Sequence, residues 1–502
     1  MKIEANSHYD CVIIGGGING AAIAADAAGR GLNVFLCEQN DLGSATSSWS
    51  TKLIHGGLRY LESYDFKLVR HALIERTRLI NRASFLVRPL PFIIPHQRHL
   101  RPKWMIRAGL FLYDHLAKRG SVPASSSVTL DHNDPHQPLR TGLDHGFQYY
   151  DCQTDDHRLV ILNALNAAQH GAEIRSHCQF QQASIKNSRW QITLKENDCL
   201  NTITADALIN AAGPWVNRVL DQQITLPTQD RVTLIQGSHI VVKQHYPQAH
   251  AYLLQNPDGR IIFTIPYEQD YTLIGTTDTP FTGDPATASV SDDEVNYLLS
   301  TTNHFFQKQL QRQDIVWQYS GVRALYNPDQ ADPSKITREY HLSLNDSGGA
   351  PLLSVLGGKL TTHRQLAEDA VDLLQPHFAS MGACQTTTQA LPGGDLGGLS
   401  DSAFCQQCKA QFSHLDEALV EQYFFRYGSR ILQLLQDCDQ QDDLGQRFSA
   451  TLYAREIDFM LENEWATCAE DVLWRRSKHG LRMTPSECDA VAQYIAAQQH
   501  RQ

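Results

Sequence analysis

Three features that define other classes of protein are missing from this 502-residue sequence. No run of about 20 consecutive apolar residues occurs, so we expect no membrane-spanning helix. Basic residues are outnumbered by acidic ones, 43 to 54, and the net charge of −11 argues against nucleic acid as a partner, because a phosphate backbone is bound by clustered cations. No basic and then apolar leader precedes the first expected strand, which predicts a cytoplasmic protein.

The 11 cysteines also lack the spacing of a disulfide framework. The C-x-x-C pair, Cys405 and Cys408, has no second pair with which to complete a zinc site. We therefore expect free thiols in a reducing compartment, and no bound metal. The length allows two or three domains with a sizeable core.

The most informative segment of the sequence is 10–41. A strand-like stretch leads into Gly15-x-Gly17-x-x-Gly20, and an alanine-rich helical stretch and a second strand follow, ending on Glu38. Such glycines permit a tight turn, close approach of the backbone to a pyrophosphate and close packing of helix on strand, and the helix N-terminus stabilises the phosphate charge. The acid suits a ribose diol and would repel a 2′-phosphate. The segment therefore predicts binding of FAD or NAD.

The rest of the chain changes character twice. Helical patterns are expected at about 66–85 and from the N-cap Asp155 to Gly171. Closely spaced β-rich segments between 237 and 323 favour a largely antiparallel sheet, separate from the nucleotide unit. Beyond about 398, apolar residues recur at helical spacing, which predicts a helical C-terminal region.

Eight motifs together resemble one family, the bacterial FAD-dependent, aerobic glycerol-3-phosphate dehydrogenases, over nearly the full chain. In chain order they are GGGINGAAIAADAAGRG (15–31), TSSWSTKLIHGGLRYLE (46–62), INAAGPWVN (209–217), GSHIVV (237–242), IGTTDTP (274–280), YSGVRAL (319–325), ITREY (336–340) and GGKLTTHR (357–364). The resemblance is specific, because these motifs rarely occur together elsewhere.

This resemblance implies an α/β plus α fold with three domains. They are a glutathione-reductase-like FAD-binding domain from 1–72, 141–225 and 316–386, an antiparallel-sheet substrate-binding domain from 73–140 and 226–315, and a helical C-terminal cap domain at 387–502. It also implies oxidation of sn-glycerol 3-phosphate to dihydroxyacetone phosphate by hydride transfer to FAD, with electrons passed to membrane quinone. The expected partners are glycerol 3-phosphate, the quinone, the inner face of the cytoplasmic membrane, to which the protein binds peripherally, and a second copy of the chain in a homodimer.

Candidate FAD-binding residues come from four of the motifs and from Glu38, which follows the second expected strand. The hydroxyl-rich loop at 46–57 can offer donors to a diphosphate and to the flavin edge, and INAAGPW ends a strand in a glycine, as where a backbone meets a ligand. GGKLTT opens a helix whose amides can stabilise negative charge on a reduced flavin. The candidates are Gly15, Gly17, Ile18, Asn19, Gly20, Glu38, Thr46, Ser47, Ser48, Lys52, Leu53, His55, Gly57, Gly213, Trp215, Gly358, Lys359, Leu360 and Thr361.

Candidate substrate-binding residues are cations and donors, because a phosphate dianion in a closed pocket must be neutralised. The matched motifs supply Arg59, Tyr60, Arg323, Arg338 and Lys359. We expect Arg338 and Arg59 to hold the phosphate through the planar arginine fork, with Tyr60 as a further donor. Arg323 is expected closer to the reacting carbon, where it orients the C2 hydroxyl and stabilises developing charge.

The hydroxyl proton calls for a base with a pKa near neutrality, which favours histidine. His55, in LIHGG, is the first candidate, because it precedes a glycine pair expected beside the flavin. His239, in GSHIVV, is the second, and it is also a candidate for substrate binding, although a lone histidine in a strand is commonly a structural residue. Water remains a third alternative.

The segment 98–119 mixes basic residues with exposed-type apolar ones, among them Arg101, Lys103, Trp104 and Phe111. Such a mixture is typical of a helix that lies in a membrane interface, with its cations toward the headgroups. An ordinary amphipathic helix packed on the core is the alternative.

Three other functions compete with this interpretation. An oxidase of the same superfamily would pass electrons to O₂, and an amino-acid or amine oxidase would need one carboxylate-binding arginine rather than a group of cations. A non-catalytic flavin-binding scaffold would keep the glycine motif and have no reason to gather histidines and arginines near GGKLTT.

Overall fold

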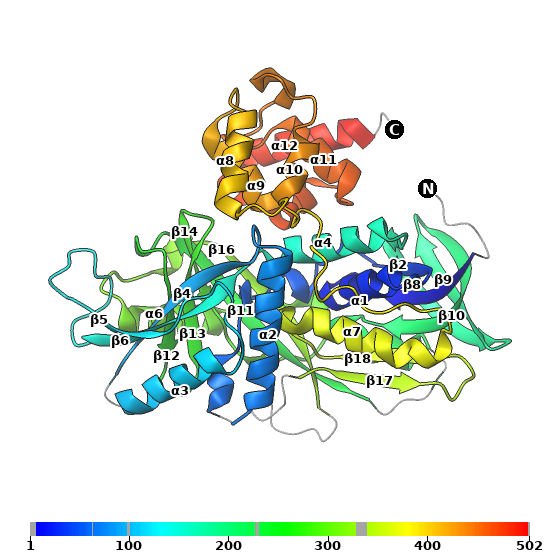
Figure 1. Cartoon of the computed structure of the whole chain (residues 1–502), viewed down its shortest axis with the longest axis horizontal. Helices are drawn as coiled ribbons and strands as arrows, with labels where there is room; N and C mark the ends of the chain where they lie inside the picture. Colours follow the sequence, from blue (N-terminus) through cyan, green and yellow to red (C-terminus); the bar gives the residue numbers. More distant parts are fainter. Residues whose placement is uncertain are drawn as a thin grey trace.

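The structure is a computed structural model that describes residues 7–62, 64–97, 101–224, 226, 230–327 and 339–499. Two sheets lie side by side, and a helical C-terminal domain packs above both of them in the view of Figure 1. The expected α/β plus α architecture is therefore confirmed.

The first sheet carries the glycine motif. Its strands run in the order β17, β18, β10, β1, β2, β7, with β9 paired to β10 and β8 paired to β9. The strand β1 pairs in parallel with both β2 and β10, because the connections cross over through helices. The bounds are β1 His8–Ile14, β2 Val34–Cys37, β7 Glu173–Arg175, β8 Cys178–Lys186, β9 Arg189–Glu196, β10 Cys199–Asn210, β17 His341–Asn345 and β18 Leu352–Leu356.

Helices α1 (Ile18–Gly29), α4 (Asp156–Gln169) and α7 (His363–Leu374) cover one face of this sheet, with α1 in the middle (Figure 1). Cys11 and Ile13 of β1 belong to the apolar cluster formed with these helices, whereas Val12 and Ile14 belong to the cluster formed with β8, β9 and α5 (Val216–Gln222). Both faces of β1 are buried, as is usual for a central parallel strand. The predicted strand, helix and second strand of the glycine motif are confirmed.

The second sheet runs in the order β15, β11, β14, β13, β12, β4, β6, β3, with β16 paired to β11 and β5 paired to β6. Among the strands that the structure describes, its pairs are antiparallel except for β12 with β4. The bounds are β3 Leu53–Ile54, β4 Arg88–Pro95, β5 Ser126–Thr129, β6 His145–Gln153, β11 Val232–Lys243, β12 Ala251–Gln255, β13 Ile261–Tyr267, β14 Tyr271–Gly275, β15 Thr279–Pro280 and β16 Ile315–Tyr326.

Two strands of the second sheet come from ranges that the expected boundaries give to the FAD-binding domain. The FAD-binding domain is expected to include 141–225 and 316–386, and β6 and most of β16, which fall in those ranges, pair with strands of the second sheet. These two strands therefore place residues from the expected FAD-binding ranges in the second sheet.

Three further helices flank the sheets. Helix α2 (Phe66–Arg82) is capped by Asp65, whose carboxylate accepts a hydrogen bond from the Leu68 amide at 3.2 Å, a cap that contributes about 1 kcal/mol. Helix α6 (Asp292–Phe305) begins with a capping box. Helix α3 (Lys103–His115) lies at the edge of the molecule remote from the C-terminal domain (Figure 1).

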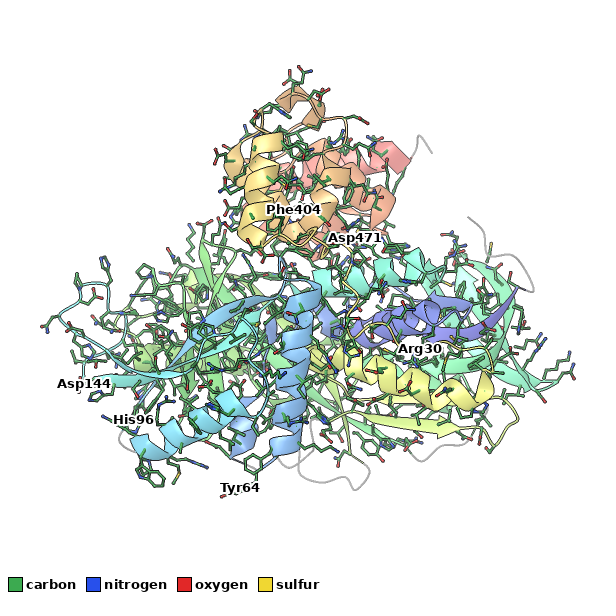
Figure 2. All side chains as sticks on the ribbon, viewed as in Figure 1. Arg30, Tyr64, His96, Asp144, Phe404 and Asp471 are labelled. Atoms are coloured by element: carbon green, nitrogen blue, oxygen red, sulfur yellow. The ribbon has the colours of Figure 1, made fainter. Side chains whose placement is uncertain are left out.

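The C-terminal domain consists of helices and connecting turns, as the sequence predicts. Its helices are α8 Asp401–Gln411, α9 Glu417–Tyr427, α10 Ile431–Leu434, α11 Ala454–Asn463 and α12 Pro485–Gln499. Phe404 points into this domain (Figure 2), and the neighbouring Cys405 and Cys408 are buried free thiols of α8. Within the described ranges, no three His, Cys, Asp or Glu side chains gather as a metal site requires.

Candidate functional site

A cavity of about 1480 Å³ receives residues from both sheets. Twenty of the predicted site residues line it: Gly15, Gly17, Ile18, Asn19, Glu38, Thr46, Ser47, Leu53, His55, Gly57, Arg59, Tyr60, Gly213, Trp215, His239, Arg323, Gly358, Lys359, Leu360 and Thr361. Gly20, Ser48 and Lys52 do not line the cavity. Arg338 lies outside the described residues.

The glycine turn closes one end of the cavity. Gly15 has a φ of +103°, a backbone conformation that favours glycine, and a Cβ there would lie 2.7 Å from the carbonyl oxygen of Ala211. A Cβ on Gly20 would lie 1.9 Å from the carbonyl oxygen of Gly15, so Gly20 serves close packing of α1 behind the turn. Helix α1 begins at Ile18, with Gly17 as its N-cap, which directs the positive end of its dipole to the cavity.

Glu38 stands at the end of β2, as predicted for a ribose ligand. Its carboxylate accepts hydrogen bonds from the amides of Gly16, at 2.8 Å, and Asn40, at 2.9 Å. Burial raises the pKa of Glu38, and these two amide donors oppose that change. Each carboxylate oxygen keeps a lone pair with which to accept a ribose hydroxyl.

The loop 46–57 joins the glycine turn to the second sheet. Ser47 Oγ accepts a hydrogen bond from the Ile18 amide at 3.0 Å, and Thr46 Oγ1 donates to the carbonyl oxygen of Val322 in β16 at 2.6 Å. These contacts fix the first turn of α1 against a strand of the other sheet.

Lys52 and Ser48 differ from their predicted role as cofactor ligands. The Lys52 ammonium is buried, 2.7 Å from Asp156 Oδ1 and 2.9 Å from the carbonyl oxygen of Ser48. Ser48 Oγ donates to the carbonyl oxygen of Gly43 at 2.5 Å. A buried ammonium requires a neutralising partner, and Asp156 holds Lys52 behind the loop. Both side chains therefore stabilise the loop from its far side.

The segment 357–361 forms the opposite wall. Gly357 and Gly358 have φ values of +84° and +114°, and a 3₁₀ turn then leads into α7. Asn19 Nδ2 donates to the carbonyl oxygen of Gly357 at 3.2 Å, while its buried Oδ1 has no hydrogen-bond partner among the described residues. Thr361 Oγ1 accepts from the His55 amide at 3.1 Å. Three distant segments thus meet at the cavity, and Asn19 keeps an acceptor for a ligand.

His55 is held as a neutral imidazole. Burial is the largest influence on its pKa and lowers it, and Lys359 and Arg76 lower it further, whereas Asp151 opposes the shift. A neutral imidazole that lines the cavity can accept a proton near pH 7.

A buried network fixes the turn that follows His55. The Gly56 amide lies 3.0 Å from Tyr113 Oη and 3.2 Å from Asp151 Oδ1 and donates to both. Arg76 Nη1 lies 2.7 Å from the same carboxylate oxygen, so the negative charge of Asp151 is paired. The three side chains come from α2, α3 and β6, and Asp151 also lines the cavity.

His239 of β11 lies at the cavity wall but is held tightly. Its Nε2 is 3.0 Å from Thr51 Oγ1, and its ring stacks on Tyr319 with centroids 4.9 Å apart. Burial, followed by the charges of Lys52 and Arg323, lowers the pKa of His239 well below the usual histidine value. Its Nδ1 is buried without a hydrogen-bond partner in the described part of the chain.

Three predicted cations border the cavity. Arg323 Nη2 donates to the Thr277 carbonyl oxygen and to Asp278 Oδ1, each at 3.1 Å. The Lys359 ammonium lies 4.3 Å from the centre of the Tyr60 ring, a cation–π contact. Arg59 is exposed at the rim.

Sequence reasoning missed several residues of the site. Asp278 lies inside the matched motif IGTTDTP, so the sequence did offer a carboxylate that could pair with Arg323. Asp151, Arg218 and Arg260 also line the cavity; Arg218 directly follows the INAAGPWVN motif, and the other two lie in no matched motif.

A dinucleotide cradle that opens into a cavity lined by two histidines and three cations fits a flavin-dependent oxidoreductase. The chain belongs to the FAD dependent oxidoreductase family, whose model matches residues 10–364. Residues 384–500 match the C-terminal domain of alpha-glycerophosphate oxidase. FAD is the cofactor of this family, and the glycine turn, Glu38 and the acceptor left on Asn19 fit it.

Named relatives and a solved structure are similar over nearly the whole chain. A glycerol-3-phosphate dehydrogenase of Pseudomonas aeruginosa is 48% identical, covering 98% of this chain and 95% of the relative. A D-erythritol 1-phosphate dehydrogenase of Brucella abortus is 41% identical, covering 97% of each. The glycerol-3-phosphate dehydrogenase of Bacillus halodurans complexed with FAD superposes with a TM-score of 0.75 at 25% identity, covering 98% of this chain and 95% of that one.

Proposed function

We propose that the protein oxidises sn-glycerol 3-phosphate to dihydroxyacetone phosphate and passes the electrons to a membrane quinone. The observation that carries this proposal is the cavity, whose lining combines an FAD cradle with Arg323, Lys359, Arg59 and His55, whose pKa burial lowers. The name of the 48% identical relative supports the same substrate.

The cations suit a phosphate dianion, because desolvated phosphate needs several charged donors. Arg59, Tyr60 and Lys359 belong to two neighbouring segments of the cavity wall, joined by the cation–π contact, and they can meet the phosphate oxygens there. Arg338 is proposed as a further phosphate ligand. Arg323 comes from the second sheet and is proposed to orient the C2 hydroxyl.

FAD, when bound, supplies the hydride acceptor for the C2 hydrogen. The task of the chain is to position the substrate carbon and to take up the hydroxyl proton. His55 is proposed as the base, because its imidazole is neutral and its backbone is fixed by Thr361. His239 is proposed to contact the substrate and to remain a secondary candidate for the base.

Peripheral binding to the inner face of the cytoplasmic membrane is proposed through one surface patch. We name it the α3 patch: the exposed Trp104, Met105, Phe111 and Leu112 of α3, together with Tyr64 and the first residue of α2, Phe66, whose rings lie 6.1 Å apart at the same edge of the molecule. Trp104, Phe111 and Tyr64 are 70%, 58% and 80% exposed. Figure 2 shows Tyr64 at the edge of the molecule opposite the C-terminal domain.

The burial of α3 favours the interfacial role over that of a core helix. Among its residues, Leu110, Tyr113 and Asp114 are buried, and the apolar side chains of the patch stay outside. Aromatic side chains next to Arg101 and Lys103 suit the headgroup region of a bilayer. In the part of the chain that the structure describes, no helix combines the length and apolar character needed to cross a membrane.

Two measurements test the acceptor and the assembly. The holoprotein is reduced with glycerol 3-phosphate without oxygen and then mixed with a short-chain quinone or with air-saturated buffer. Fast reoxidation by quinone with little peroxide is expected, and dominant peroxide release would support the oxidase instead. Light scattering during size exclusion tests the proposed homodimer.

The Brucella abortus relative raises a second candidate substrate, a four-carbon polyol phosphate. Steady-state kcat/KM for glycerol 3-phosphate and D-erythritol 1-phosphate distinguishes the two. We expect the three-carbon substrate to be preferred, and a higher kcat/KM for the four-carbon compound would reassign the substrate.

A further inference from the structure

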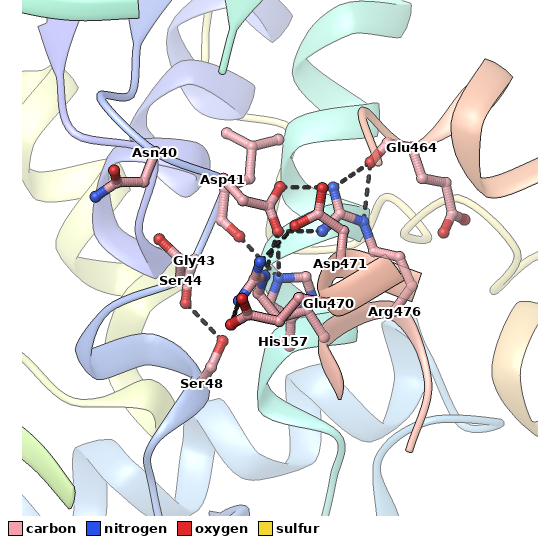
Figure 3. Close-up of polar contacts among 12 residues, drawn as sticks. Asn40, Asp41, Gly43, Ser44, Ser48, His157, Glu464, Glu470, Asp471 and Arg476 are labelled. Atoms are coloured by element: carbon pink, nitrogen blue, oxygen red, sulfur yellow. Dashed lines mark hydrogen bonds and ion pairs between the residues drawn. The ribbon is translucent and has the colours of Figure 1, made fainter. Parts of the chain in front are cut away.

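The C-terminal domain contacts the FAD-binding domain through a buried cluster of charged side chains (Figure 3). Asp471 lies at the seam between the domains in Figure 2 and starts the π-helical turn 471–476. Two arginines of this turn reach Asp41: Arg475 Nε lies 2.7 Å from Oδ2, and Arg476 donates to Oδ2 at 2.5 Å and to Oδ1 at 2.8 Å. The Asp41 side chain is 2% exposed, so water screens these ion pairs little.

Asp41 occupies the middle of the loop that forms one wall of the cavity. The stretches on either side, 38–40 and 45–47, line the cavity, whereas Asp41 itself does not. The loop is tied to the glycine turn, since the Gly43 amide donates to the Gly16 carbonyl oxygen at 3.0 Å. A displacement of Asp41 would therefore move both lining stretches and the turn.

The arginines are in turn held from several sides. Arg475 pairs with Asp471 and with Glu470, the latter at 2.6 Å, both from the C-terminal domain. Arg476 Nε donates to the Glu464 carbonyl oxygen at 3.0 Å. The position of Asp41 is thus set by a turn whose other contacts lie in a different domain.

Helix α4 completes the seam between the domains. His157 Nε2 donates to the Leu42 carbonyl oxygen at 2.7 Å and lies 3.9 Å from the Asp41 carboxylate. Burial and the neighbouring Arg476 lower the pKa of His157 well below its usual value, so this imidazole adds no positive charge. The Glu464 carboxylate pairs with Arg158 of α4, which docks the C-terminal domain beside the loop.

We propose that the C-terminal domain retains FAD by holding the loop 38–47 through the contact of Arg475 and Arg476 with Asp41. Asp41 is a positioning residue, because it acts through the lining residues beside it. Binding free energies are reciprocal, so FAD in the cavity also stabilises the docked 471–478 segment. This inference goes beyond the proposed substrate and does not depend on it.

The first test uses Asp41→Asn in the full-length holoprotein. The substitution removes the charge that the two arginines face and keeps the shape of the side chain. FAD release is followed by the recovery of flavin fluorescence after dilution, without any turnover. Release about tenfold faster than from the unaltered protein is expected, within the usual range of coupling between sites. An unchanged release rate would overturn the proposal.

A matched control separates cofactor retention from general loss of stability. Asp458→Asn removes the charge of a half-buried carboxylate of α11 that accepts a hydrogen bond from Tyr494 of α12, inside the C-terminal domain. At temperatures equally far below the Tm of each variant, this control is expected to release FAD at the unaltered rate. If it releases FAD as fast as Asp41→Asn, the loop contact has no specific role.

A second test needs no substitution and remains decisive if Asp41→Asn does not fold. Hydrogen exchange of the amides at 471–478 is compared in the FAD-bound protein and in protein freed of FAD. Reciprocity predicts faster exchange in this segment after FAD removal, with α12 unaffected. Equal exchange in the two states would contradict the proposal.

Discussion

The Tyr113 hydroxyl of α3 donates a hydrogen bond to Asp151 Oδ1 at 2.7 Å. This contact connects helix α3, which carries the α3 patch, to the turn that follows His55. The Gly56 amide donates to both side chains, and Arg76 balances the charge. These contacts give the His55 segment a fixed position at the cavity.

Asp151→Asn is expected to lower both stability and activity. The substitution leaves the buried Arg76 charge without its partner, which costs about 3 kcal/mol. A loosened turn displaces His55, so kcat should fall more than KM rises. Thermal unfolding and steady-state kinetics measure the two effects.

Tyr113→Phe is the matched control for Asp151→Asn. It removes the hydrogen bond that Tyr113 donates to Asp151 and the one that it accepts from the Gly56 amide, and it keeps the Arg76 pair, so a loss of about 1.5 kcal/mol is expected. Equal effects of the two substitutions would show that the charge of Asp151 is unimportant.

Arg323→Lys is expected to lower kcat/KM for glycerol 3-phosphate about 100-fold, or ~3 kcal/mol. Lysine keeps the charge and loses the planar guanidinium, whose Nη2 contacts Asp278 and Thr277. The flavin spectrum should not change, because the fold of the cradle does not depend on this side chain. An unaltered rate of flavin reduction would remove Arg323 from the site.

The two histidines are distinguished by their effect on the pH profile. Because the pKa of His55 is lowered by burial, kcat/KM should be constant near pH 7 and fall only below about pH 6.5. His55→Asn is expected to abolish this acid limb together with most of the activity. His239→Asn should retain the limb, and the opposite pattern would make His239 the base.

Buried histidines also predict the pH dependence of stability. Burial lowers the pKa of His245 to about 4 and that of His363 to about 3, below the unfolded value of about 6.5. As pH falls below 6.5 the unfolded chain binds protons that the folded chain refuses, so the free energy of unfolding decreases. Each such group contributes a slope of about 1.4 kcal/mol per pH unit.

The histidine contribution is measured by denaturant unfolding between pH 7 and pH 5. The His245 ring packs at a tilt against that of Phe306, with centroids 4.7 Å apart, and does not line the cavity, so His245→Gln tests the contribution of one group. The slope of the unfolding free energy against pH is expected to be smaller in the variant by about 1.4 kcal/mol per pH unit, which corresponds to one proton fewer bound on unfolding. A free energy that does not change between pH 7 and pH 5 would contradict the lowered pKa values.

Membrane binding by the α3 patch is tested with the double substitution Trp104→Glu and Phe111→Glu. Charged residues at these exposed positions should abolish sedimentation with anionic lipid vesicles and leave flavin reduction by substrate unchanged. Leu200→Glu is the control, because Leu200 is equally exposed, at 69%, on the first sheet and outside the patch. Retained vesicle binding by the double variant would place the membrane contact elsewhere.

Local pattern was sufficient for the nucleotide half of the site. The turn from Gly15 to Gly20 and the acid Glu38 lie within one βαβ unit, so their spacing along the chain sets their positions in space. The C-terminal helices were predictable for a similar reason, since helical periodicity is local.

Residues that act through distant contacts could not be placed from the sequence. Lys52 lies in a matched motif, but its partner Asp156 is 104 positions away and draws its ammonium behind the loop. Asp151 reaches Gly56 and Arg76 only because β6 pairs beside β3 and α2 packs nearby. Pairing between strands far apart in the chain decides such contacts, and hydrophobic periodicity does not specify it.

The central claim is that the cavity binds FAD and a three-carbon phosphoester together. Anaerobic titration of the FAD-bound protein with glycerol 3-phosphate, followed through the flavin absorbance, tests it most directly. We predict stoichiometric bleaching by glycerol 3-phosphate, and none by glycerol, inorganic phosphate or amino acids. Bleaching by an amino acid, with glycerol 3-phosphate inert, would contradict the account.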